Sequence, residues 1–337
     1  MKRFITGLVI LFLAAGTVFS QTAINLDQYR TGIEDFADDL AAVLPLNSSI
    51  GLNWNDAYIG QILDVPPHFG IGVTAGFTTI PYGPIKNLVE DAMGGNSDDI
   101  PSLVKSVGVP VPAGVIDARI GGFFLPFDIG LKVGYLKFDM SDIKVDYLLL
   151  GGDVRYCVLE QAVFIPKISV GVGFNYMKTD ATLGGIMNAT TIDASAAYGH
   201  AAGADMVSMT SPDLYLEMES KVLDFKVQAS WNVLIIEPSI GLGASYGFSQ
   251  VAAGAESRLL MNGSDINLNP ADMATLSGLG YDVDSDGIGY TKNVSAASFR
   301  AFGGVGFLLP FVRIDLGLLY GLTTRSWGAS LGGRFQL

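Results

Sequence analysis

Hydrophobic and polar residues alternate along most of the chain after residue 66, most clearly in residues 297–337. Three runs there place apolar side chains at every second position, with glycine, polar or arginine side chains between them. Side chains of a strand point alternately to opposite faces, so each run predicts a strand with one apolar face. The last run continues to the end of the chain, where Phe335 stands two places before Leu337.

A proline introduces such a run five times, at Pro67, Pro126, Pro166, Pro238 and Pro310. Proline cannot donate to a strand ladder, so it fits the first residue of a strand or a turn. We expect strands in one direction near 67–79, 127–138, 166–178, 237–249 and 311–322, and strands in the other near 114–125, 144–158, 212–234, 296–309 and 325–337. The apolar phase of 212–234 shifts after Lys221, which predicts a bulge or an extension above the membrane.

The connections are short at one end of these strands and long at the other, at about 80–113, 180–211 and 250–296. This asymmetry is typical of outer-membrane barrels. We therefore predict an all-β fold, an antiparallel transmembrane β-barrel of about ten strands with both ends periplasmic. If residues 48–62 join the sheet instead of packing inside it, twelve strands are expected. A soluble secreted β-sandwich is a third interpretation.

The hydropathy of the chain agrees with a membrane location. Mean hydropathy is +0.39, although no stretch after the N-terminus has the ~18 apolar residues of a membrane helix. Residues 1–20 have the basic start and short apolar run of a secretory signal. Residues 24–44 predict an amphipathic helix with an acidic face, ended by Pro45. The expected domains are a signal at 1–20, an N-terminal plug-like segment at 21–65 and a barrel at 66–337.

The charge of the chain limits its partners. The formal net charge is −13, which argues against nucleic acid. The single cysteine, Cys157, predicts a buried, inert thiol. We expect a monomer in contact with outer-membrane lipid, recognised by the barrel-assembly machinery through its C-terminal strand.

The strand faces opposite the apolar ones carry charges that should line the lumen. These residues are Asp117, Arg119, Asp128, Lys132, Asp153, Arg155, Lys167, Lys226, Arg300, Arg313, Asp315 and Arg334. Eight of them are basic and four acidic. One interpretation is a lumen filled by ion pairs, because small barrels are packed inside. A second is a basic lining that selects anions. A third places the acidic helix 24–44 in the lumen as a plug.

Two further motifs bear on metal binding and catalysis. Asp282, Asp284 and Asp286, followed by Gly287, begin like a calcium loop, but Asn293 replaces its final carboxylate, so only a loose calcium site in an outer loop is predicted. The two histidines, His68 and His200, belong to no known catalytic or zinc motif. We expect no enzymatic activity and no other cofactor.

The strand ending on Leu337 resembles the C-terminal strand of bacterial outer-membrane β-barrels, which usually finishes on phenylalanine. In layout the chain is also similar to the long-chain fatty-acid transporter family, whose members carry an N-terminal hatch in the lumen. That family's Asn-Pro-Ala occurs here only at 269–271, in a loop, so no ligand residues are transferred. The resemblance implies passage or uptake of small or hydrophobic molecules, gated by the N-terminal segment and long loops. The alternative is a non-conducting surface protein whose loops bind an extracellular partner.

Overall fold

The computed structural model describes residues 40–59, 68–82, 102–122, 125–140, 143–162, 165–183, 190–193, 206–209, 213–256, 259–261, 264–265, 282–284 and 287–337. The expected signal, the acidic part of the expected helix, His200 and Asp286 lie outside these residues. Among the described residues, no helix is long and apolar enough to cross a membrane.

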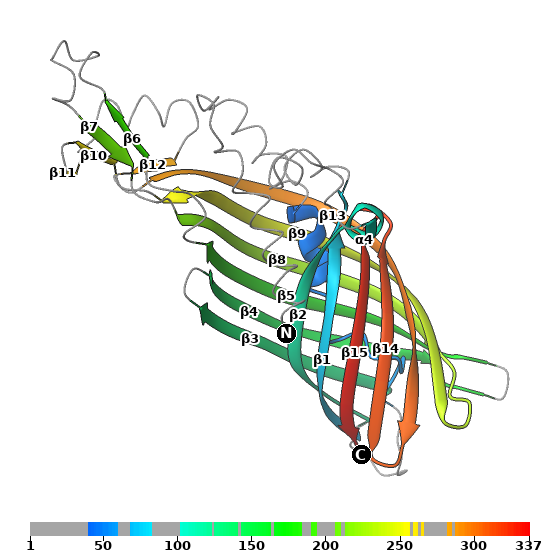
Figure 1. The fold of residues 1–337 in the computed structure, drawn as a ribbon. Helices are drawn as coiled ribbons and strands as arrows, with labels where there is room; N and C mark the ends of the chain where they lie inside the picture. The colour runs from blue at the N-terminus through cyan, green and yellow to red at the C-terminus, as the bar shows by residue number, and fades with distance from the viewer. Residues whose placement is uncertain are drawn as a thin grey trace.

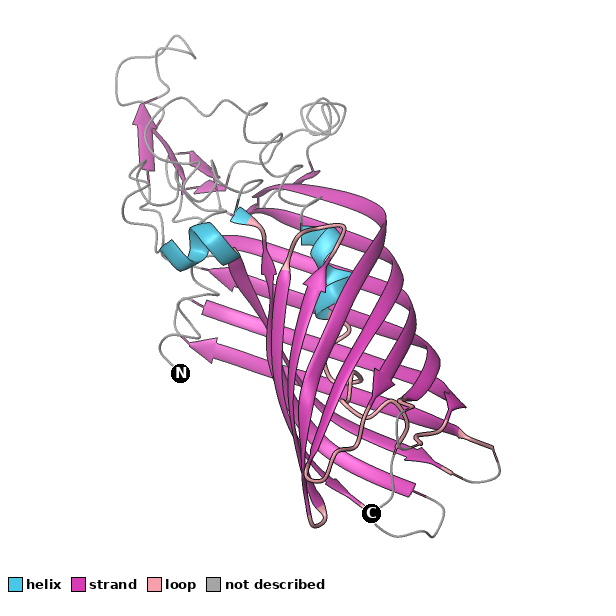
Figure 2. Ribbon diagram, turned by 90° about the vertical axis from the view of Figure 1, so that its right-hand side faces the viewer, coloured by secondary structure: helices cyan, strands magenta, loops and turns pink. Residues whose placement is uncertain are grey.

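Ten antiparallel strands form the barrel (Figures 1 and 2). They are β1 (His68–Ile80), β2 (Val109–Gly121), β3 (Phe127–Met140), β4 (Ile143–Leu159), β5 (Lys167–Leu183), β8 (Asp213–Ser230), β9 (Ile236–Glu256), β13 (Gly287–Leu309), β14 (Val312–Gly321) and β15 (Trp327–Gln336). Pairing of β13 with β9 and of β1 with β15 closes the sheet. The ten-stranded prediction is confirmed, and the twelve-stranded alternative is wrong because residues 48–59 form turns and bends inside the barrel.

The remaining elements are short. Residues 40–47 are helical, and α4 (Ser102–Val107) precedes β2. A separate sheet joins β6 (Thr190–Asp193), β7 (Met206–Met209), β10 (Leu259–Met261) and β11 (Ser264–Asp265). It pairs segments of two upper connections that are far apart in the sequence. β12 (Asp282–Asp284) pairs with the start of β13.

The barrel wall is uneven in height. We call the end where β1 begins and β15 ends the lower rim, and the opposite end the upper rim. β14 and β15 have 10 residues each, whereas β8, β9 and β13 have 18, 21 and 23. A membrane crossing needs about 9–11 residues. The long strands therefore continue above the membrane, and the upper connections are shorter than the sequence suggested.

An apolar belt covers the outside of the lower part of the wall. Its exposed members include Ile71, Leu131, Val154, Val172, Phe225, Leu242, Leu316 and Leu331. Aromatic side chains stand toward its edges, among them Tyr135, Tyr246, Phe299 and Trp327 above and Phe69, Tyr156 and Phe335 below. An outward apolar band between aromatic girdles is the pattern of a transmembrane barrel.

The predicted bulge in 212–234 is wrong, whereas its alternative, an extension above the membrane, agrees with the length of β8. This strand pairs with both β5 and β9 without a register shift. The residues that face inward change along the strand from Met218 and Val222 to Asp224 and Lys226, all buried. The same alternate positions of β8 therefore face inward throughout, and only the polarity of these inward side chains changes along the strand.

One seam of the wall is only partly paired. β2 pairs with β3 over Ile116–Gly121 alone, whereas β1 pairs with β2 along the whole strand. Above this stretch β2 carries Pro110 and Pro112. Proline tolerates an unpaired strand edge because it has no N–H to leave unsatisfied. β2 and β3 thus separate toward the upper rim, as Figure 1 shows.

Candidate functional site: the filled lumen

Residues 40–59, which we call the lumen segment, run down the inside of the barrel (Figures 1 and 2). Near the upper end, Leu46 packs with Phe302 and Leu319. Near the lower rim, the backbone N–H of Ile59 donates to Asp128 Oδ2 over 2.9 Å. The interior of the described barrel is therefore occupied along most of its length.

The helical part of the lumen segment differs from the sequence prediction. The helix does not end at Pro45 but continues to residue 47, with Ser48 N–H donating to Leu44 O over 2.8 Å. Proline removes only its own N–H, so later turns can still form. Residues 40–47 are apolar on nearly all sides, and the acidic face expected at 24–39 lies outside the described residues.

All the charged residues predicted for the lumen lie inside the barrel. Ten of them are buried: Asp117, Arg119, Asp128, Lys132, Asp153, Arg155, Lys226, Arg300, Arg313 and Arg334. Asp315 and Lys167 are partly buried, with side-chain exposures of 13% each.

One ion-pair cluster joins β2, β3, β4 and β8. Asp128 accepts hydrogen bonds from Arg119 at 2.5 Å and from Arg155 at 2.8 and 2.9 Å. Asp153 lies 2.7 Å from both Arg119 and Lys226. Each carboxylate thus meets two cations, as buried charges require.

A second cluster joins β9, β14 and β15 to the lumen segment. Arg313 donates to Glu237 over 2.6 Å, and Arg334 donates to Asp315. Asp56 of the lumen segment lies 3.1 Å from Arg334 and 3.8 Å from Arg313, as a charge contact without hydrogen-bond geometry.

The ionisation of Asp56 follows from these neighbours. Burial alone would raise the pKa of its carboxyl, but the guanidinium groups of Arg334, Arg313 and Arg155 outweigh burial and hold the pKa below its ordinary value. Asp56 is therefore charged inside the barrel at neutral pH.

The wall also holds the backbone of the lumen segment. Its carbonyl oxygens accept hydrogen bonds from inward side chains: Lys132 to Ser48 and Ile50, Arg119 and Lys226 to Leu52, Gln228 to Trp54, Arg155 to Asp56 and Lys167 to Tyr58. An irregular segment cannot satisfy its own carbonyls as a helix does. The basic wall residues therefore bind both carboxylates and peptide carbonyls.

Trp54 is the central side chain of these contacts. Its Nε1 donates to Asp117 Oδ1 over 2.9 Å. The guanidinium carbons of Arg334 and Arg119 lie 4.2 and 5.4 Å from its ring centroid, within range of cation–π attraction. Trp54 thus ties the lumen segment to β2 and β15.

Three acidic lumen residues escaped the sequence reasoning: Asp56, Asp224 and Glu237. Asp224 pairs with Arg300 over 2.6 Å and was hidden by the supposed phase shift. Glu237 stands in the inward row of β9, next to Pro238, and Asp56 belongs to no strand. With these included, the eight basic residues predicted for the lumen face seven acidic ones. The basic lining read from the sequence is nearly neutralised.

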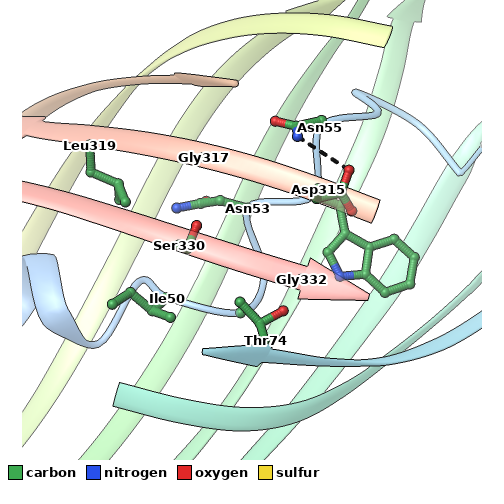
Figure 3. Close-up of a pocket in the computed structure, with 11 residues that line it drawn as sticks. Ile50, Asn53, Asn55, Thr74, Asp315, Gly317, Leu319, Ser330 and Gly332 are labelled. Atoms are coloured by element: carbon green, nitrogen blue, oxygen red, sulfur yellow. Dashed lines mark hydrogen bonds between the residues drawn. The ribbon is translucent and has the colours of Figure 1, made fainter. Parts of the chain in front are cut away.

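The space left inside is small. A cavity of about 20 Å³ lies between the lumen segment and β14 and β15, and one of about 10 Å³ lies beside Lys132 and Lys226. In Figure 3, Asn53 and Asn55 face β14 and β15, and Asn55 donates to Asp315 over 3.2 Å. Such volumes hold about one water molecule each. Neither of these two cavities admits a larger solute.

The acidic motif is only partly described. Asp282 and Asp284 belong to β12, whose backbone pairs with Gly287–Gly289 as a hairpin. Calcium binding by Asp282, Asp284 and Asp286 stays a prediction. Among the described residues, no group of three or more His, Cys, Asp or Glu side chains is placed to hold a metal.

The closed sheet and its apolar belt define a transmembrane β-barrel with a filled lumen. Residues 68–337 match the family described as Lsa36-like, so the chain belongs to the Lsa36-like family. No curated protein matches the chain.

Solved structures with a similar outline include three bacterial proteins, each 10% identical to this chain. They are the outer membrane protease OmpT from Escherichia coli (82% of this chain, 99% of that chain, TM-score 0.37), a major outer membrane protein from Thermus thermophilus (81%, 100%, 0.35) and the translocator domain of the autotransporter NalP from Neisseria meningitidis (91%, 98%, 0.32).

Proposed function

We propose that this protein is a bacterial outer-membrane barrel, exported by its N-terminal signal, that is closed at rest by residues 40–59. Small or hydrophobic molecules pass or are captured only when this segment moves. The observation that carries the proposal is the filling of the lumen by a segment that takes no part in the sheet.

The nature of the contacts supports a movable segment. Wall donors bind peptide carbonyls, and water or a solute can take the place of a carbonyl as acceptor. Removing the segment also removes Asp56, which leaves eight basic and six acidic residues on the wall. The open lumen should then prefer anions weakly.

A second function is favoured by the number of these contacts. The lumen segment can be a permanent core that lets a narrow barrel fold, with the protein acting through its upper connections on an extracellular partner. The paired loop sheet of β6, β7, β10 and β11 gives such a surface some order.

Single-channel conductance in a planar bilayer separates these functions. The lower-lumen contacts are made by residues 48–59, so a deletion of 21–59 is required, and a deletion of 21–46 serves as the intermediate. We expect the full-length protein to be closed, the longer deletion to conduct steadily, and the shorter one to conduct less.

A reversible lock gives the matched control. A Cβ placed on Gly306 would lie 3.5 Å from the Cβ of Asn55, within the range of disulfides. With Cys157 replaced by alanine, oxidised Asn55→Cys/Gly306→Cys should show no openings, and reductant should restore those of the unlinked protein. If the 21–59 deletion folds, as judged by heat-shifted gel mobility, yet never conducts, passage is excluded and the second function stands.

A further inference from the structure

Two turns at the lower rim expose apolar side chains. In the turn between β8 and β9, Leu234 is 91% exposed, and in the turn between β13 and β14, Phe311 is 45% exposed. We call these turns, residues 233–235 and 310–311, the lower tips. Scattered apolar residues are ordinary on a protein surface, so exposure alone does not identify a contact. The backbone of the lower tips supplies a second observation.

Both exposed side chains stand on a backbone conformation that disfavours them. Leu234 has a φ of 57° and Phe311 a φ of 62°, in the left-handed region that glycine and asparagine occupy at least cost. Leu234 lies between Val233 and Ile236, whose backbones bond to each other over 2.8 and 3.0 Å, and such tight turns favour glycine or asparagine where φ is positive. A bulky apolar residue therefore costs free energy here, and a contact that buries it would offset that cost.

The tip between β8 and β9 is also held from the side. Gln161, in the neighbouring turn between β4 and β5, donates from Nε2 to the carbonyl oxygen of Asn232 over 2.9 Å. Its Oε1 accepts a hydrogen bond from the backbone N–H of Asn232 over 2.7 Å. The side-chain amide thus bonds to this turn as a neighbouring strand would. Leu234 and Ile235, which is 66% exposed, are therefore presented by a turn that is fixed at its base and at its flank.

The lower tips lie at the lower boundary of the membrane. The outward row of β8 changes from charged to apolar between Lys221 and Leu223. A crossing of about 9–11 residues counted from Leu223 ends at residues 231–233. The same count from Tyr320, at the upper end of the outward row of β14, ends at residues 310–312. Both tips therefore stand where the hydrocarbon meets the headgroups, in the leaflet at the lower rim, which we call the lower leaflet.

We propose that the lower tips insert into the lower leaflet, where Leu234 and Phe311 contact phospholipid acyl chains and fix the depth of the barrel in the membrane. A protein partner would require a polar rim around the contact. Instead, the outward rows of β8 and β14 carry no charged residue between their upper boundary and the tips, and the ring of Phe311 stacks on that of Phe335 in the lower girdle at 6.4 Å. The inference concerns the lower rim alone and holds whether or not the lumen segment moves.

The accessibility of attached nitroxides tests the position of the tips. With Cys157 replaced by alanine, a nitroxide is attached to Leu234→Cys or to Phe311→Cys. The matched control is Arg325→Cys, in the upper turn between β14 and β15, where φ is 56°. Each protein is reconstituted in vesicles of phosphatidylethanolamine and phosphatidylglycerol. Relative to position 325, we expect the ratio of collisions with oxygen, which concentrates in lipid, to collisions with a water-soluble nickel chelate to be several-fold higher at positions 234 and 311.

Substitution by asparagine separates backbone strain from lipid contact. Asparagine tolerates the left-handed backbone better than leucine or arginine, so a tip surrounded by water should be stabilised by it. The proposal predicts the opposite for the lower tip: Leu234→Asn should lower the urea midpoint of unfolding in the same vesicles, because an apolar contact with lipid is lost. Arg325→Asn, at a matched φ in the upper turn, should raise that midpoint.

Three results would overturn the proposal. Nickel accessibility at positions 234 and 311 equal to that at position 325 would place the lower tips in water. A raised urea midpoint for Leu234→Asn would show that relief of strain outweighs any contact of the leucine with lipid. Dipolar broadening between nitroxides at position 234 would identify a second copy of the chain, and not lipid, as the partner that covers the tip.

Discussion

The upper and lower parts of the barrel interior are filled through different kinds of interaction. In the upper part, leucine and valine side chains of helix 40–47 are buried against apolar wall residues. In the lower part, residues 48–59 are held by lysine and arginine side chains of the wall, which donate to carbonyl oxygens of the segment, to wall carboxylates or to both. Burial of apolar surface is non-directional, whereas a buried charge requires placed partners.

The contrast has a counterpart outside the barrel. Where the interior is apolar, β8 carries Glu219 and Lys221 outward, and these form a surface ion pair at 2.9 Å. Where the interior is charged, the same strand carries Leu223 and Phe225 outward into the belt. This change from apolar to polar outward side chains marks the upper boundary of the membrane, because the strands above that boundary are surrounded by water.

The largest effect should come from leaving a charge unpaired in the lower part. Asp128→Ala removes the shared acceptor of Arg119 and Arg155, so the free energy of unfolding should fall by about 3–5 kcal/mol. Urea unfolding in lipid vesicles measures it. Asp146→Ala, which removes the exposed partner of Lys137, should cause no measurable loss. If Asp128→Ala lowered the free energy of unfolding no more than Asp146→Ala, the buried ion pairs of Asp128 would not stabilise the barrel.

A cavity in the upper part should be nearly as costly. Leu44→Ala leaves a cavity between helix 40–47 and the apolar upper part of the wall and should cost about 2–5 kcal/mol in the same assay. Leu318→Ala, on the lipid-facing side of β14 at 63% exposure, leaves no internal cavity and should cost less. The comparison between the two parts fails if the exposed site proves the more sensitive.

An intermediate effect is expected where the wall makes room for the segment. A Cβ on Gly70 would lie 2.8 Å from the ring of Trp54, so Gly70→Ala should destabilise by about 1–3 kcal/mol and increase channel openings. Gly333→Ala meets no atom within 4 Å and should change neither quantity. If the frequency of channel openings is unchanged in Gly70→Ala, the position of Trp54 does not control closure of the lumen.

The smallest change in stability is expected for a single hydroxyl group in the upper part. Tyr147→Phe deletes a buried hydroxyl that has no partner within the described residues, so stability should rise by about 1 kcal/mol. A loss of stability in the urea assay would instead reveal a hydrogen bond to that hydroxyl.

Much of the barrel could be predicted from the sequence because strand period and proline positions are local signals. The ten strands follow from alternation, and the inward charges from its phase. The predicted bulge in 212–234 is wrong, because alternation shows which face of a strand is apolar and does not show which face is inside the barrel. For the same reason Asp224 was not predicted to face the lumen.

The interior could not be predicted as well. The carbonyl acceptors of residues 48–58 have no side-chain signature, so nothing in their sequence shows that Lys132 or Lys226 binds them. Asp56 is one carboxylate among many outside the strands. Its meeting with Arg334 is a contact 278 positions apart that only the closed sheet creates.

The lumen segment is also linked to the closure of the sheet. It directly precedes β1, and the seam that closes the sheet joins β1 to β15, down to the bonds between Phe69 and Leu337. Because residues 40–59 are joined through the chain to β1, one of the two strands of that seam, filling of the lumen and closure of the sheet involve the same end of the barrel chain.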